Sequence, residues 1–214
     1  VAVIGPLVGT FAAPILATVI DARGSTWLFV GLALLHLLPL PFLRSTHLQS
    51  STRPRQQRHR PVPAAFVLLL CLGALTLGGS AIFVYAADIG LSANGMSALA
   101  VSMAFSLNAL ASVPSARSRR PRRHSGVWIA LTGATTAVVT IVHEPVVYLA
   151  AMAVWGYAFW MAVPGAFGLL ASRSRYPEER AGDAQAIMAT GRVFGPLLGG
   201  VLYVNAPTWV LGAV

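Results

Sequence analysis

Apolar runs of membrane-spanning length alternate with short polar connections along the whole chain. A helix that crosses a bilayer needs about 20 predominantly apolar residues. Seven runs have the required length and an eighth begins at Thr208. The seven are Val1–Ile20, Thr26–Leu43, Ala64–Ala86, Gly95–Pro114, Gly126–Val142, Val146–Ala171 and Ala184–Val204. Because lipid offers no partner to a free backbone amide, the pattern predicts an all-α polytopic membrane protein.

Composition supports a lipid-facing surface. The 214 residues are 56% hydrophobic and 10% charged, whereas soluble domains carry about 25% charged residues. The net charge is +9, and every cationic side chain is an arginine. In a soluble protein this charge would indicate a nucleic-acid partner. Here the arginines mostly lie between apolar runs, so we expect the lipid bilayer as a partner and no nucleic acid.

The arginines are concentrated in every second connection. Of the 15, five lie in residues 44–63, five in 115–125 and three in 172–183. Cytoplasmic loops of membrane proteins carry an excess of positive residues. The pattern therefore predicts that these three connections are cytoplasmic in a multi-pass protein of the cell membrane.

The longest connection, residues 44–63, is polar, contains proline and has no apolar period. Such a segment is typical of a flexible linker. It predicts two membrane units, residues 1–43 and 64–214, joined by a basic cytoplasmic linker.

A pattern of small residues is repeated near both ends of the chain. In Ala184–Val204 the members are Gly191, Gly195, Pro196, Gly199 and Gly200. A shorter copy near the start of the chain has Gly5, Pro6 and Gly9. Glycines four residues apart share one helix face and let a second helix approach closely. We expect all eight residues to serve helix packing; a sliding surface during transport is a second, compatible role for the glycines.

These features resemble the major facilitator superfamily, whose members have two six-helix bundles related by a pseudo-two-fold axis. The segment Gly191–Gly200 matches the G-x-x-x-G-P-x-x-G-G core that proton antiporters of the family carry in helix five. The resemblance implies that Val1–Ile20 is helix five and Ala184–Val204 helix eleven. We therefore expect the sequence to cover helices five to twelve, as an N-terminally truncated fragment whose last helix is also cut short.

The resemblance further implies a secondary active transporter that moves a small organic solute by alternating access. The glycine pattern favours proton-coupled efflux, with protons as the coupling ion. The rival interpretation is a non-transporting membrane scaffold or receptor derived from a transporter half. It is favoured by residues 116–123, which keep the arginines of the family's G-x-x-x-D-R-x-G-R-R turn without its glycines and acid.

Enzymatic activity is not expected. The sequence has no nucleotide-binding loop, no nucleophile elbow and no spacing typical of metal ligands. We accordingly predict no cofactor and no metal site.

One charged residue, Arg192, lies within an apolar run. A charge near mid-membrane costs at least about 2.5 kcal/mol, so it should face the bundle interior or a wet cavity. Arg192 is therefore a candidate to bind an anionic group of the substrate or an acid elsewhere in the protein. The alternative is a structural ion pair with Asp183 or Glu179.

Three further residues are candidates for substrate contact. Trp155 and Phe159 are four residues apart, so they share a helix face and provide a flat apolar surface. Aromatic anchoring at the membrane interface is the alternative for this pair. Asn108 is a lone amide in an apolar run, which suits either a substrate or a hydrogen bond between helices.

Overall fold

A computed structural model of the chain describes residues 27, 31, 34, 59–117 and 124–213. The chain divides into two compact units. One comprises Val1–Thr10 and His59–Val214, and the other Phe11–Arg58.

Several predicted features lie outside the described residues: the helix at Val1–Ile20 with Gly5, Pro6 and Gly9, most of Thr26–Leu43, and residues 44–58 of the linker. In the second unit the structure describes only Trp27, Gly31 and Leu34, which are helical.

The described part of the first unit is built from helices, and no strand occurs among its described residues. The helices are α3 (Pro63–Ser92), α4 (Ala98–Arg117), α5 (Ser125–Ile141), α6 (Pro145–Arg173), α7 (Pro177–Asn205) and α8 (Thr208–Gly212). In this part of the chain α3, α4, α6 and α7 are long and apolar enough to cross a membrane, whereas α5 has 17 residues. The all-α, membrane-spanning fold predicted from the apolar runs is confirmed.

Proline marks the start of three helices. Pro63, Pro145 and Pro177 each occupy the first turn of a helix, where a missing N–H costs nothing. The predicted start of the last long helix was wrong: α7 begins at Pro177, not at Ala184. The predicted connection 172–183 is therefore wrong in extent, since only residues 174–176 separate α6 from α7. A search for apolar runs misses this start because the first turn of α7 is acidic. The acids nevertheless favour a helix there, because negative charge near a helix N-terminus is stabilising.

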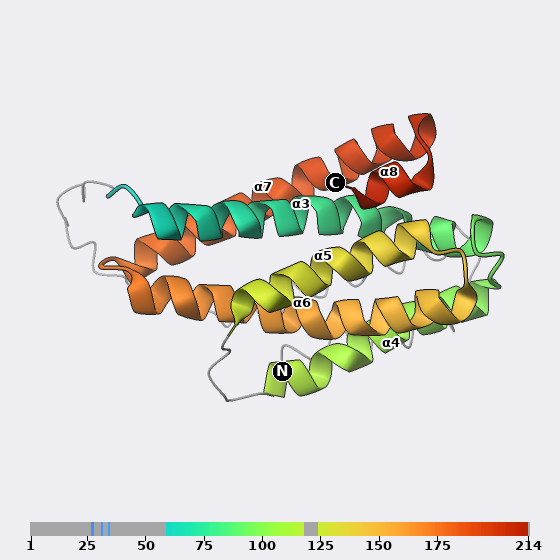
Figure 1. Cartoon of the computed structure of the whole chain (residues 1–214), viewed down its shortest axis with the longest axis horizontal. Helices are drawn as coiled ribbons and strands as arrows, with labels where there is room; N and C mark the ends of the chain where they lie inside the picture. Colours follow the sequence, from blue (N-terminus) through green and yellow to red (C-terminus); the bar gives the residue numbers. More distant parts are fainter. Residues whose placement is uncertain (1–26, 28–30, 32–33, 35–58, 118–123, 214) are drawn as a thin grey trace. The chain divides into compact units, whose positions relative to one another are not determined.

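Helices α3 and α7 lie side by side and run in the same direction (Figure 1). Gly191, Gly195 and Gly199 are buried in this contact. A Cβ atom at Gly195 would overlap the Leu77 carbonyl oxygen, and one at Gly199 would lie 2.5 Å from the Ala81 carbonyl oxygen. Only glycine therefore permits the observed separation between the two backbones.

The α3–α7 pair is fastened by tyrosines at the end where both helices finish. Tyr203 of α7 donates a hydrogen bond to the carboxylate of Asp88 on α3. The rings of Tyr85 and Tyr203 stack with centroids 5.0 Å apart. The Tyr85 hydroxyl also donates to the Pro196 carbonyl oxygen over 3.3 Å. These contacts hold the register between the two helices.

An ionic cluster around the buried Arg180 joins the two helices at their opposite end. Arg180 is 2% exposed; its Nη1 lies 2.7 Å from Asp183 Oδ2, and its Nη2 donates to Glu179 Oε2 over 3.0 Å. Arg180 Nη2 also donates to the His59 carbonyl oxygen over 2.5 Å. The His59 backbone N–H donates to Glu179, and its ring stacks on Tyr176 at 3.8 Å. The segment before α3 is thereby attached to the start of α7.

Helix α6 lies between α4 and α5 (Figure 1). A Cβ atom at Gly156 would overlap the Asn108 carbonyl oxygen, so glycine again sets the α4–α6 separation. Asn108 Nδ2 donates to the Met152 carbonyl oxygen over 2.8 Å. At the start of α6 the buried Tyr148 hydroxyl donates to the Ala86 carbonyl oxygen over 2.6 Å, which links α6 to α3.

The buried core of the described part forms two separate clusters. The first joins α3, α4, α5, α6 and α8 and includes Ile82, Ile89, Val101, Tyr148 and Trp155. The second joins α3, α6 and α7 and consists of Leu69, Leu72, Ala166, Leu170, Ala184 and Met188. The middle of the bundle lies between them.

The glycine contact generates the first prediction. Gly195→Leu should separate α3 from α7 because its side chain has no room beside the Leu77 backbone. We expect a loss of stability of about 1–3 kcal/mol, the usual cost of overpacking. The measurement is the thermal unfolding midpoint in detergent. Gly133→Ala is the matched control, since nothing lies within 4 Å of that position. Equal midpoints for Gly195→Leu and the wild type would contradict the role of this contact.

The ionic cluster generates the second prediction. Arg180→Gln should lower the unfolding midpoint by several degrees, because it removes the buried partner of two carboxylates and the donor to the His59 carbonyl oxygen. Arg175→Gln is the control, since Arg175 is exposed in the neighbouring turn. If both variants unfold at the same temperature, the cluster does not hold α7 in place.

Candidate functional site

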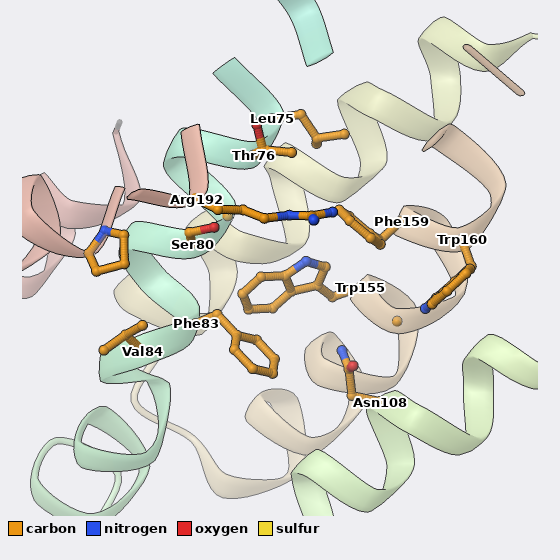
Figure 2. Close-up of a pocket in the computed structure, with 13 residues that line it drawn as sticks. Leu75, Thr76, Ser80, Phe83, Val84, Asn108, Trp155, Phe159, Trp160 and Arg192 are labelled. Carbon is orange, nitrogen blue, oxygen red and sulfur yellow. The ribbon is translucent and has the colours of Figure 1, made fainter. Parts of the chain in front are cut away.

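A cavity of about 420 Å³ occupies the middle of the described bundle, between the two core clusters (Figure 2). Helices α3, α4, α6 and α7 all contribute to its wall. The lining residues are Leu75, Thr76, Gly79, Ser80, Phe83, Val84, Asn108, Trp155, Gly156, Phe159, Trp160, Arg192 and Pro196. None of them is acidic.

Each contributing helix presents residues from near its midpoint. Arg192 lies about 22 Å from the first residue of α7 at 1.5 Å per residue. Asn108 and Phe159 are similarly central in α4 and α6. The cavity is therefore about equally far from both ends of the long helices.

Arg192 provides the one charge in the cavity wall. Its side chain is exposed, and Figure 2 shows it extending from α7 across the cavity in the direction of Phe159. Within the described part of the chain Arg192 makes no hydrogen bond and no ion pair. The carboxylates offered as alternative partners, Asp183 and Glu179, both contact Arg180 instead.

Aromatic rings form the apolar part of the wall. Trp155 is 4% exposed and meets Phe83 edge to face, with ring centroids 5.6 Å apart. Phe159 and Trp160 meet edge to face at 6.3 Å. Phe83 and Trp160 remain 43% and 39% exposed. The cavity thus combines a fixed indole with rings that are free to contact a ligand.

Three neutral polar side chains complete the wall, and one of them, Thr76, donates its hydroxyl to the backbone of its own helix. Asn108 uses Nδ2 to bond Met152, which leaves its Oδ1 as an acceptor at the cavity. The hydrogen bond between helices that the sequence offered as one alternative is therefore present. The Ser80 hydroxyl makes no hydrogen bond to another described residue, and Figure 2 shows it beside the Arg192 side chain. Both groups are available to hydrogen-bond a ligand.

The structure places all four predicted contact residues, Arg192, Asn108, Trp155 and Phe159, in the wall of this single cavity. The helix at Ala64–Ala86 was expected to line the cavity, but sequence reasoning named none of its residues and so missed Ser80 and Phe83. The run containing them is almost uniformly apolar, so no polar position indicated which face points inward. The one available signal was the interruption at Gly78, Gly79 and Ser80.

A second hollow of about 1090 Å³ lies between the first half of α3, the start of α5 and the last turns of α6. Its wall includes Cys71, Ile129, Leu169 and Arg173. None of the four predicted contact residues reaches it. The described residues contain no group of three or more His, Cys, Asp or Glu side chains placed to hold a metal ion.

Comparison with known proteins identifies the family of this chain. The model of the Major Facilitator Superfamily matches residues 1–200. No curated protein and no solved structure matched the chain. The family match covers nearly the whole sequence, and the described helices agree with it. The chain therefore belongs to the Major Facilitator Superfamily and is a multi-pass membrane protein of the transporter class.

Proposed function

We propose that this protein is a secondary active transporter that moves a small organic solute by alternating access, and that the central cavity contributes to its substrate site. The observation that carries the proposal is the position of the cavity midway along α3, α4, α6 and α7. In secondary transporters the substrate site lies near the bilayer midplane, where it is exposed to each side in turn.

The lining of the cavity supports a small-molecule site. Ligand sites are mostly apolar and aromatic, with a few convergent polar groups that orient the ligand. Here Arg192, Asn108 and Ser80 converge on a wall of aromatic rings. The volume of about 420 Å³ falls within the range of about 300–1,000 Å³ that is usual for such sites.

We further propose proton-coupled efflux across the cell membrane, with the arginine-rich connections in the cytoplasm. The support for coupling is the glycine and proline pattern of α7, which is shared with proton antiporters of the family. The support for orientation is the distribution of arginines between alternate connections. No acid lines the described cavity, so the group that carries the proton is proposed to lie elsewhere in the protein.

Reconstitution tests transport directly. The full-length protein in proteoliposomes should take up at least one member of a panel of radiolabelled aromatic anions, neutral amides and amines faster than protein-free liposomes do. An acidic lumen should accelerate that uptake, and a protonophore should abolish the acceleration. Uptake without any response to the pH gradient contradicts proton coupling. No uptake of any member favours the non-transporting scaffold.

Labelling of a cysteine in the cavity from each side of the membrane tests alternating access. We expect Ser80→Cys, in a Cys71→Ser background, to react with a membrane-impermeant maleimide added from either side, because Ser80 lines the cavity. Thr135→Cys in the same background is the control; Thr135 is buried in α5 and should stay unlabelled from both sides. Labelling of Ser80→Cys from one side alone, under every ligand and pH condition, would exclude alternating access at this cavity.

A further inference from the structure

We propose that the cavity selects organic anions that combine a carboxylate with a flat apolar ring system, and that Arg192 sets this charge preference. The inference rests on the proposed function of the cavity as a substrate site, and it names the substrate class. It is carried by the charge, the packing and the hydrogen-bond state of the wall.

Among the described residues, the charge of the cavity wall is positive and no carboxylate balances it. Arg192 is the one ionic side chain among the lining residues, and the wall contains no aspartate or glutamate. Arg192 is exposed, so solvent weakens its attraction for an anion, but no carboxylate among the described lining residues competes for it. An anionic ligand therefore gains an interaction in this cavity that a neutral ligand lacks, and a cationic ligand is repelled.

The described acids are not available to neutralise Arg192. Glu179 and Asp183, on the same helix, are bound to Arg180 at the start of α7. Asp88 accepts a hydrogen bond from Tyr203 near the far end of α3. Glu144 precedes the first residue of α6, and Glu178 lies in the first turn of α7. Each of these carboxylates is near a helix end, whereas Arg192 is central.

The chemistry of arginine favours a planar anion. The guanidinium is planar and always charged, and it presents parallel N–H donors that match a carboxylate in two-point contact. Lysine would supply the charge without this geometry. The exposed Arg192 side chain extends into the cavity, so its donors are open to a ligand (Figure 2).

The aromatic wall favours a flat apolar body next to the anionic group. The rings most open to a ligand are those of Phe83 and Trp160, and the buried Trp155 supports Phe83 through an edge-to-face contact. Phe159, toward which Arg192 extends, lies one helical turn beyond Trp155. Aromatic pairs prefer offset-stacked or edge-to-face arrangements with centroids about 4.5–7 Å apart. A ring system in the cavity meets several such surfaces, which an aliphatic ligand of equal size does not exploit.

Equilibrium binding to the purified full-length protein tests the charge preference. The probes are naphthoate, naphthamide and naphthylmethylammonium, which share one ring system and differ in charge. Titration calorimetry should give naphthoate an affinity at least about tenfold above that of naphthamide, a difference of about 1.4 kcal/mol. Naphthylmethylammonium should bind more weakly than both.

Variants assign that preference to one residue. Arg192→Gln should reduce naphthoate affinity at least about tenfold and leave naphthamide affinity within about twofold of the wild type. Arg192→Lys should retain part of the preference, because it keeps the charge without the planar donors. Arg173→Gln, a change of the same kind at the end of α6 outside the cavity, should alter neither affinity. An unchanged unfolding midpoint shows that each variant is folded.

Three results would overturn the inference: naphthamide binding as tightly as naphthoate, an Arg192→Gln variant that keeps the preference, or no measurable naphthoate binding. Flux measured in proteoliposomes separates this failure from failure of the proposed function. A protein that carries amides or amines but not carboxylates is a transporter with a different substrate class. A protein that carries no solute is not a transporter at all.

Discussion

The close approach of α3 and α7 is the contact on which the described bundle depends. Membrane helices gain little from burying apolar surface against one another, because lipid is equally apolar. Their association relies on backbone proximity, and Gly191, Gly195 and Gly199 provide it on one face of α7. The same face fixes the rotation of α7 and so directs Arg192 into the cavity. A helix-packing motif thereby decides where the one central charge of the described bundle points.

The α3–α7 pair is held along its whole length, and α4 and α6 form a second close pair. Polar contacts fix the first pair at both ends, with Arg180 at one end and Tyr203 at the other. Gly156 and Asn108 fix the second pair near its middle. The central cavity lies between these two pairs, and its lining side chains come from both. A relative movement of the pairs would change the cavity while each pair keeps its internal register.

The sequence was enough to predict the described helices and several polar and aromatic residues of the site, and the physical reasons are clear. Apolar runs mark spanning segments because the bilayer has a fixed thickness, and the described helices follow those runs closely. Arg192 and Asn108 were found because polar groups are rare in apolar runs. Ser80 and Phe83 were missed because a uniformly apolar helix does not show which face is internal. The early start of α7 was missed because its first turns are polar, and hydropathy detects only the apolar part of a helix.

The ionic cluster around Arg180 could not be predicted from the sequence, for a different reason. His59 and Arg180 are 121 residues apart, and no spacing rule connects them. Their contact exists only because α3 and α7 run side by side in the same direction. By sequence these residues belong to two separate basic connections, whereas the structure joins them in one network around the buried Arg180.

The division of the core into two clusters has a consequence for how such a protein evolves. Ser80, Phe83, Trp160 and Arg192 line the cavity and belong to neither cluster. Substitutions at these four positions remove few of the contacts that stabilise the fold. Trp155 is the exception, since it belongs to the larger cluster and to the cavity at once. Gly156 and Asn108, which set the α4–α6 contact, are constrained as well. Adaptation to a new ligand is therefore open mainly at the four positions outside the clusters, where variation among homologues should accumulate.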